Sequence, residues 1–509
     1  MTRPRSAPAH SLNTDMLAAR VALCERHIAE MLAPLEPVSA TTAWFDTLRA
    51  IEECINLPTV DWDDDALEQS LYEIPVLGLL SDPAALAVTR ARLIDHFSEP
   101  FANRFVQLLV RGSAVARAFA GYGLPDAAAG FLTVGTMIGY LQSRRRHYVA
   151  LLHAMPLLCK GQQRVNPLDT FNLFLPLVET QGLPLWSAHE ALLINASCDK
   201  LGIRPATSLD RAALDPMFLE PERSRITEMP MTDAGLAMLE HRETLMDDRL
   251  FSAAELRNDI LLLEAAYAEF DLTGSDFADA ATFVRQMSRL YVERDYWVAI
   301  KPAALRSLME KLQLSGTLKA ALVHTDATYF GCLATYAPLV LVGGMYRSTV
   351  SLLSRFLYHW RAVSLDRRKR YQIRSGFIFE KAVAERLERQ GFAVQNITRI
   401  NHHEFDVVTL RGGVIWNVQC KNNFLDLERL EAEPARFATY NHRLVRGYER
   451  ALTKESHREH LLRSKLATEE VHHIVVSRFP VVTDNPRIVP FSRIDTVAAY
   501  ADQPTSDRL

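Results

Sequence analysis

A pair of consecutive glycines between two short apolar runs constrains the C-terminal part of this chain more than any other feature. Residues 405–410 and 414–420 are rich in the β-branched and aromatic residues that favour strands, and Gly412 and Gly413 lie between them. A two-residue turn needs positive φ at both positions, which glycine adopts readily. The sequence therefore predicts a β-hairpin.

The hairpin determines which polar side chains share one face of the sheet. With the two glycines as the turn, Asp406 is predicted to lie opposite Gln419, and directly opposed residues share a face. Lys421 lies two residues beyond Gln419 and shares that face, because strand side chains alternate. One carboxylate, one amide and one ammonium group are therefore expected close together.

A helix is predicted before the hairpin, over residues 377–390. Its apolar face carries Phe377, Ala384 and Leu387 at helical spacing. Glu380 lies on the same face, where an unpaired charge would be costly to bury, so this carboxylate is expected to have a partner or to serve a site. Gly391 follows the last turn, as a helix C-cap glycine does.

A helix packed on the Asp406 face would bring Glu380 to Gln419 and Lys421 as well. Carboxylate and amide oxygens are hard ligands suited to Mg²⁺, which usually keeps several waters and needs only one or two carboxylates. Such an ion polarises a phosphodiester and lowers the pKa of a bound water, and an adjacent lysine stabilises the charge that develops on phosphorus.

The order of these residues resembles the PD-(D/E)XK nuclease superfamily. The sequence Gly376 to Glu380 has the form G-x-x-F-E, Asp406 follows, and Gln419 to Lys421 has the form Q-x-K, as in the Mrr-like restriction endonuclease branch. The resemblance implies that Asp406, Gln419 and Glu380 hold Mg²⁺, with Mn²⁺ as a substitute, and that Lys421 is the catalytic lysine. It covers roughly residues 375–500.

Two departures from the family pattern keep an alternative open. Phe405 stands where the family has proline, and Gln419 is neutral, so the site holds one negative charge fewer than a D…E-x-K site. The alternative is a catalytically silent nuclease fold that binds nucleic acid or acts as a scaffold. An RNA-cleaving enzyme with the same site is a further alternative.

A long helix or two short helices are predicted over residues 434–465, followed by strands at 471–476 and 487–489. The helical region carries a basic stripe at steps of three and four residues, namely Arg443, Arg446, Arg450, Lys454 and Arg458. Side chains spaced in this way can follow a phosphate backbone. From residue 366 onward the chain has 24 Lys and Arg against 19 Asp and Glu, although the whole chain has a net charge of −4.

The first three quarters of the chain carry no comparable motif. Residues 14–365 are predicted to form a large all-α region, with a subdivision near 201–230 where prolines interrupt it. Residues 1–13 are expected to be a disordered tail, and residues 366–374 a basic linker. The run from Ala327 to Tyr346 lacks charged residues, and we interpret it as a buried helix ending near Gly343 and Gly344, because Pro338 and several polar residues disfavour a membrane span.

Six cysteines lie scattered without C-x-x-C spacing, which fits a reducing compartment and argues against a disulfide framework or a zinc site. We therefore expect a cytoplasmic protein without membrane contact. The predicted architecture is multidomain, with the all-α region followed by an α/β restriction-endonuclease-like domain with a mixed central sheet at 375–503. The predicted function is Mg²⁺-dependent cleavage of DNA in restriction or anti-phage defence, with the helical region sensing, binding a protein partner or forming a homo-oligomer.

Overall fold

The computed structural model describes residues 9–59, 65–79, 82–203, 232–243, 252–270, 272–365, 368–423, 432–479 and 481–502. Residues 1–8 of the expected tail and most of the expected subdivision at 201–230 lie outside these ranges. Helix α1 (Ala9–Leu32) begins within the expected tail, at Ala9. The last proline of the N-terminal segment is Pro8, so nothing after it prevents helix formation.

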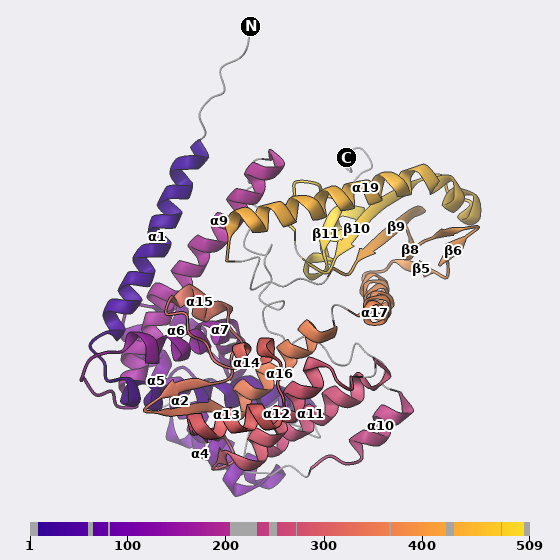
Figure 1. The fold of residues 1–509 in the computed structure, drawn as a ribbon. Coiled ribbons are helices and arrows are strands. Elements are labelled where there is room, and N and C mark those ends of the chain that lie inside the picture. The colour runs from indigo at the N-terminus through magenta and orange to yellow at the C-terminus, as the bar shows by residue number, and fades with distance from the viewer. Residues whose placement is uncertain are drawn as a thin grey trace. The chain divides into compact units, whose positions relative to one another are not determined.

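The chain divides into two compact units (Figure 1). The unit that we call the helical unit comprises the described residues of 19–187 and 231–361. The sheet unit comprises the described residues of 1–18, 188–230 and 362–509.

Helices form most of the helical unit. They are α1 from Ala19 onward, α2 (Pro37–Asn56), α3 (Asp65–Tyr72), α4 (Pro83–His96), α5 (Glu99–Gly121), α6 (Pro125–Ala129), α7 (Val134–Leu158), α8 (Leu175–Leu177), the start of α9 (Leu183–Leu201) up to Ser187, α10 (Asp233–Leu239), α11 (Ala253–Ala266), α12 (Asp276–Leu290), α13 (Pro302–Lys311), α14 (Gly316–Ala321), α15 (Tyr329–Ala334) and α16 (Val350–Leu365) up to Arg361. Two π-helical segments, Thr170–Phe174 and Val178–Gly182, flank α8. Local sequence explains several of the starts: Ser98 caps α5 by accepting the N–H of Phe101, and Pro100 lies in the first turn.

The helical unit is not all-α, which corrects the prediction. It contains a four-stranded antiparallel sheet of β1 (Val292–Glu293), β2 (Trp297–Ile300), β4 (Met345–Thr349) and β3 (Val340–Val342), in that order. Where a buried helix was expected over residues 327–346, the structure has the short helix α15, which ends at Ala334. Gly343 and Gly344 have φ of 58° and 75° and form the turn between β3 and β4, because positive φ at two successive glycines suits a hairpin.

A mixed five-stranded sheet forms the centre of the sheet unit, as predicted. Its order is β11 (Ile488–Pro490), β10 (Val471–Ser477), β9 (Val414–Lys421), β8 (Val407–Arg411) and β5 (Ala393–Gln395). The first three strands are parallel and the last two are antiparallel to their neighbours. A separate pair of strands, β6 (Arg399–Ile400) and β7 (His403–Glu404), lies between β5 and β8 in the chain. Helix α20 (Thr496–Ala501) follows the sheet.

Two helices cover opposite faces of this sheet (Figure 1). Helix α17 (Lys369–Glu388) buries Phe379 and Val383 in one cluster with Val407 and Val418 of the hairpin. Helix α19 (Pro434–Leu466), one continuous 33-residue helix, places Leu462 in another cluster with Val408 and Ile415. Helix α19 also provides the crossover that the parallel pair of β9 and β10 requires.

Three details differ from the expected domain. Helix α17 begins at Lys369, so the described part of the expected linker at 368–374 is largely helical. Phe377 is 59% exposed, because the buried face of α17 passes instead through Phe379, Val383 and Leu387. The described C-terminal part of α9 also belongs to this unit, since Leu193 packs in one cluster with Phe437 and Val475.

Across the described ranges, no helix combines the length and the apolar character that crossing a bilayer requires.

Candidate functional site

The predicted hairpin is confirmed, together with its register. Val407 pairs with Val418, and Arg411 pairs with Val414 across the turn. Gly412 and Gly413 have φ of 58° and 78°, as a two-residue hairpin turn requires. One step beyond the last pair, the same register places Asp406 opposite Gln419.

Asp406 is attached to the neighbouring strand through its side chain. Its Oδ2 accepts the backbone N–H of Cys420 over 2.7 Å, so the carboxylate is held against the end of β9. Burial raises the pKa of Asp406, while this N–H and the nearby Lys421 ammonium act in the opposite direction. Among the described residues, this N–H is the one hydrogen-bond donor to the Asp406 carboxylate, which therefore has unused acceptor capacity for a ligand.

Gln419 and Lys421 are in direct contact. Lys421 Nζ donates a hydrogen bond to Gln419 Oε1 over 3.3 Å. Gln419 is 7% exposed, and among the residues that the structure describes its Nε2 has no hydrogen-bond partner. An unsatisfied buried donor costs about 1–3 kcal/mol, which is the kind of strain that functional sites retain.

Glu380 lies on α17, within the helix predicted for it, and is half-buried. Strand alternation puts Gln419 on the face opposite to Val418, which packs in one cluster with Phe379 and Val383 of α17. Asp406 lies in a bend just before β8. Glu380 is on α17, so its helix covers the face opposite to Gln419 and Lys421 and not, as predicted, the same face.

Glu380 is nevertheless within electrostatic range of the same groups. The half-buried carboxyl has its pKa raised to about 7, first by burial and then by the charges of Asp406 and Glu404, with Lys421 opposing the shift. The structure therefore collects all four predicted residues at the end of the hairpin, although from both faces of the sheet. Two desolvated carboxyls that repel each other beside a lysine are typical of functional sites.

The donor set fits a hard cation that retains water. Among the described residues, no group of three or more His, Cys, Asp or Glu side chains is placed to hold a metal ion. Asp406, Glu380 and the Gln419 amide oxygen supply two carboxylates and one neutral oxygen, which is the small protein contribution that Mg²⁺ typically accepts. A cation would also relieve the repulsion that raises the pKa of Glu380.

The basic stripe on α19 is divided by burial. Arg443, Arg446, Arg450 and Lys454 are exposed, and Arg446 Nη1 lies 3.1 Å from Glu449 Oε2. Arg458 does not belong with them. It is 7% exposed and lies over the Phe405 ring at 4.7 Å, because it is the partner of a buried carboxylate.

That carboxylate is Glu455, the centre of a polar network that the sequence analysis did not identify. Glu455 is 1% exposed and accepts hydrogen bonds from Arg458 Nε over 2.9 Å and from Asn417 Nδ2 over 2.8 Å. Asn417 Nδ2 also lies 3.1 Å from His473 Nδ1, and His473 Nε2 lies 3.3 Å from Glu459 Oε2. The sequence signal for this network was Asn417, a polar residue two positions before Gln419 on the same strand face.

The network is adjacent to the site. Glu455 raises the pKa of Asp406 and Arg458 lowers it, so both charges act on the hairpin carboxylate. The buried pair therefore contributes to the electrostatic environment of Asp406 as well as to the packing of α19 on the sheet.

Comparison of the chain with known protein families, with curated proteins and with solved structures finds no match in any of the three.

Proposed function

We propose that this protein is a metal-dependent endonuclease that hydrolyses phosphodiester bonds in DNA. The observation that carries the proposal is the hairpin register, which brings Asp406, Gln419 and Lys421 together at one strand end, with Glu380 close enough for its pKa to respond to Asp406 and Lys421. The same residues carry the resemblance to the PD-(D/E)XK superfamily. That family would also give the sheet unit its restriction-endonuclease-like fold.

Each residue has a role that its surroundings support. Mg²⁺ bound here would polarise the phosphodiester and lower the pKa of a bound water. Asp406, held by the Cys420 N–H, Glu380 and Gln419 Oε1 would hold the ion. Lys421, half-buried and free to exchange its hydrogen bond to Gln419 for one to phosphate, would stabilise the pentavalent phosphorus.

The exposed part of α19 supports binding of a polyanion. Arg443, Arg450 and Lys454 are exposed on one long helix that packs on the sheet, and basic side chains in a row add salt-dependent affinity for phosphates. The setting in restriction or anti-phage defence, with the helical unit as sensor or assembly part, rests on the Mrr-like resemblance alone.

Cleavage of supercoiled plasmid and of a labelled RNA, each with Mg²⁺ or Mn²⁺, tests the proposal. We expect DNA cleavage by the full-length protein and a loss of at least about 100-fold in Asp406→Asn and Lys421→Ala, since each removes a group that acts in the transition state. Asp495→Asn and Lys381→Ala are matched controls, because these residues are exposed and form surface ion pairs with Arg386 and Glu385.

A second function has one observation in its favour. The Lys421 ammonium occupies the Gln419 oxygen, as it would in a site that no longer binds metal and only recognises nucleic acid. Salt-dependent DNA binding without cleavage under any metal condition would support this alternative. Cleavage of RNA alone would reassign the substrate, and cleavage that persists in both site variants would refute the site.

A further inference from the structure

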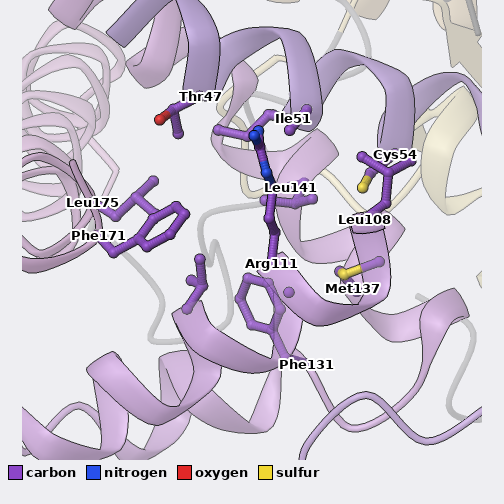
Figure 2. A pocket seen from close by; sticks show the side chains of 13 residues that line it. Thr47, Ile51, Cys54, Leu108, Arg111, Phe131, Met137, Leu141, Phe171 and Leu175 are labelled. Atoms are coloured by element: carbon purple, nitrogen blue, oxygen red, sulfur yellow. The ribbon is translucent and has the colours of Figure 1, made fainter. Parts of the chain in front are cut away.

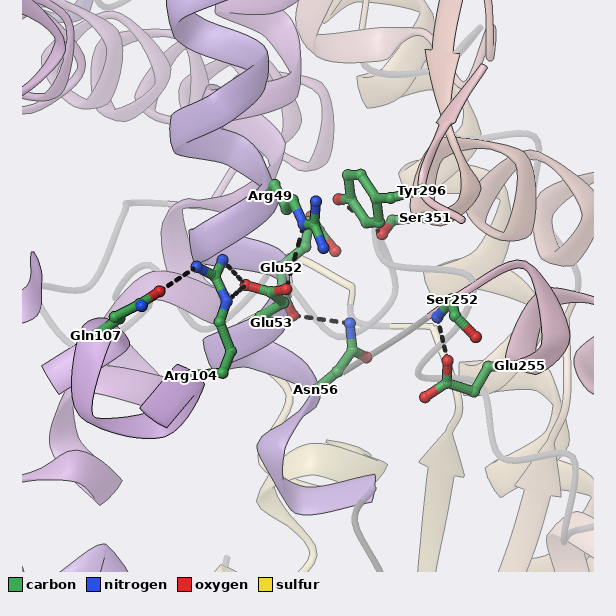
Figure 3. A network of polar contacts seen from close by, with 10 residues as sticks. All are labelled: Arg49, Glu52, Glu53, Asn56, Arg104, Gln107, Ser252, Glu255, Tyr296 and Ser351. Atoms are coloured by element: carbon green, nitrogen blue, oxygen red, sulfur yellow. Dashed lines mark hydrogen bonds and ion pairs between the residues drawn. The ribbon is translucent and has the colours of Figure 1, made fainter. Parts of the chain in front are cut away.

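Two features of the helical unit offer little to a ligand. The hollow among α2, α5 and α7 is lined mostly by apolar side chains (Figure 2) and has a volume of about 30 Å³, which is room for about two water molecules. The buried carboxylate of Glu53 accepts hydrogen bonds from Arg104 Nε over 2.8 Å and from Arg49 Nε over 3.3 Å (Figure 3), so its acceptors are in use. Neither feature therefore combines an unused polar group with room for a ligand.

A pair of histidines in the same unit has unused ligand atoms. His153 lies near the C-terminal end of α7, His324 lies in the segment between α14 and α15, and their ring centroids are 5.6 Å apart. In each ring Nε2 is buried, and among the described residues neither Nε2 has a hydrogen-bond partner. A buried polar atom without a partner lowers stability, so two such atoms in adjacent rings point to a shared ligand.

The backbone fixes which ring nitrogen is available. The Ala337 carbonyl forms a hydrogen bond with the His153 ring, and the Asp326 carbonyl forms one with the His324 ring. Because Nε2 is without a partner within the described part of the chain, the N–H that donates each of these bonds is on Nδ1, and Nε2 carries a lone pair. A histidine that ligates a metal ion typically has this arrangement, with its other N–H donated to a carbonyl or carboxylate.

The surroundings keep both rings neutral. Burial lowers the pKa of His153 to about 3, and the charges of His324 and Arg355 act in the same direction. Burial also lowers the pKa of His324, while the charge of Asp326 opposes the shift. Both rings are therefore neutral imidazoles at neutral pH, and a metal ion need not displace a proton from either of them.

The segment that carries His324 is attached to neighbouring backbone. Val323 and Leu339 form an isolated parallel bridge, which holds the start of this segment. Arg146 of α7 donates a hydrogen bond from Nε to the Leu333 carbonyl over 2.6 Å, so α15 is attached to α7. The two imidazoles are therefore positioned by the fold and need no ligand to bring them together.

The separation of the rings suits one metal ion between them. With metal–nitrogen bonds of about 2.0–2.1 Å, two imidazoles on one ion have ring centroids roughly 5 to 6.5 Å apart, and the observed 5.6 Å lies in this range.

The number of protein ligands favours copper in its monovalent state. Among the described residues, no third His, Cys, Asp or Glu is grouped with the pair, whereas Zn²⁺ in proteins takes three or four protein ligands. Imidazole suits copper, and Cu⁺ needs only two nitrogen donors. Its single charge is also opposed less than a double charge by Arg355, whose charge acts on His153.

We propose that His153 and His324 bind one Cu⁺ ion through their Nε2 atoms. His324 is only partly buried, which gives the ion access from the surface. The site lies within the helical unit and is independent of the nuclease proposal.

Copper loading of the full-length protein tests the proposal. The wild type and its variants are incubated anaerobically with Cu⁺ kept reduced by ascorbate, freed of unbound copper by gel filtration, and assayed for copper per chain. We expect His153→Phe and His324→Phe each to retain one copper ion fewer than the wild type, and the wild-type X-ray absorption spectrum to show imidazole neighbours. Copper bound by cysteine thiols is common to all these proteins and cancels in the difference.

His147→Phe is the matched control. His147 is also a buried histidine of α7, but its Nδ1 lies 3.2 Å from the Tyr329 hydroxyl, so the same substitution there should leave the copper content unchanged. His324→Phe alters a partly exposed residue and keeps the test decisive if His153→Phe does not fold.

Four results would overturn the proposal. They are equal copper content in the wild type and in folded His324→Phe, an equal loss of copper in His147→Phe, a wild-type spectrum with sulfur neighbours alone, and retention of Zn²⁺ in place of Cu⁺ in the same assay.

Discussion

The ammonium of Lys421 donates a hydrogen bond to the side-chain oxygen of Gln419 over 3.3 Å, while the amide nitrogen of the same glutamine has no partner among the described residues. The Gln419 side chain therefore accepts a hydrogen bond through its oxygen but donates none to the described residues through its nitrogen. A carboxylate of the same shape would accept from Lys421 in a stronger, charge-assisted bond and would leave no unpaired donor.

Gln419→Glu is accordingly expected to bind divalent cations about tenfold more tightly, because the site gains a carboxylate and a formal negative charge. Without a cation the same variant should be less stable than the wild type, since Asp406 and Glu380 already have raised pKa values. Manganese titration and thermal unfolding with and without Mg²⁺ measure both effects. Weaker cation binding in this variant would argue against Gln419 as a ligand.

Asp406→Asn is expected to separate stability from activity. Asparagine keeps an oxygen acceptor for the Cys420 N–H and removes a charge that burial makes unfavourable, so the folded protein should be as stable as the wild type within about 1 kcal/mol. Asp406→Leu leaves that N–H unpaired and should destabilise the protein by about 1–3 kcal/mol. Urea denaturation distinguishes the two variants. A large loss of stability in Asp406→Asn would mean that the charge itself supports the fold.

Arg458→Met is expected to destabilise the sheet unit by about 3–5 kcal/mol, because it leaves Glu455 buried without its cation. The double variant Glu455→Leu with Arg458→Met should recover most of this loss, since two apolar side chains replace the pair. Denaturant titration with hydrogen exchange at β9 and β10 provides the measurement.

The exposed pair of Arg446 and Glu449 is the matched control on the same helix. Its removal should change the free energy of unfolding by less than about 1 kcal/mol. If Arg458→Met were equally mild, the buried network would not be important for stability.

Acid is expected to destabilise the helical unit through its buried histidines. Burial lowers the pKa of His147 and of His153 to about 3, against an unfolded value near 6.5. The charges of Arg144 and Arg146 lower the pKa of His147 further. The charges of His324 and Arg355 do the same for the pKa of His153. The stabilising contribution is therefore complete above pH ~6.5 and is lost as pH falls towards 3, at about 1.4 kcal/mol per pH unit for each histidine.

In His153→Phe, the free energy of unfolding of the helical unit should fall less steeply between about pH 6 and pH 4, because one proton fewer is taken up on unfolding. Carboxylates contribute equally to both proteins and cancel in the difference. Thermal unfolding of wild type and variant across this range checks the slope. Parallel curves would show that His153 accepts a proton without unfolding.

The two glycine pairs show how far local sequence patterns lead. At Gly412 and Gly413 the flanking runs are rich in β-branched and aromatic residues, and the hairpin was predicted with its register, which the structure confirms. At Gly343 and Gly344 the same signal ended a run that was interpreted as a helix, although the structure has a hairpin between β3 and β4. The second turn was overlooked because the uncharged run around it was long enough for a buried helix, and composition cannot distinguish the two.

Residue spacing along a helix did not predict which side chains are buried. The basic stripe on α19 was defined by residue spacing, and its members Arg443, Arg450 and Lys454 are exposed. Spacing could not reveal that Arg458 lies over Phe405 beside Glu455, because these partners come from distant parts of the chain. The same reason explains why Phe377 was placed on the wrong face of α17.

Local sequence patterns were sufficient to predict the hairpin, its register and hence the grouping of Asp406, Gln419 and Lys421, because positive φ at glycine and the alternation of strand side chains are local properties. Three arrangements became visible only in the folded chain: α17 covers the face opposite to Gln419 and Lys421, Arg458 is buried with Glu455, and part of α9 belongs to the sheet unit. These arrangements depend on which apolar surfaces exclude water together, and that choice is made between segments far apart in the chain.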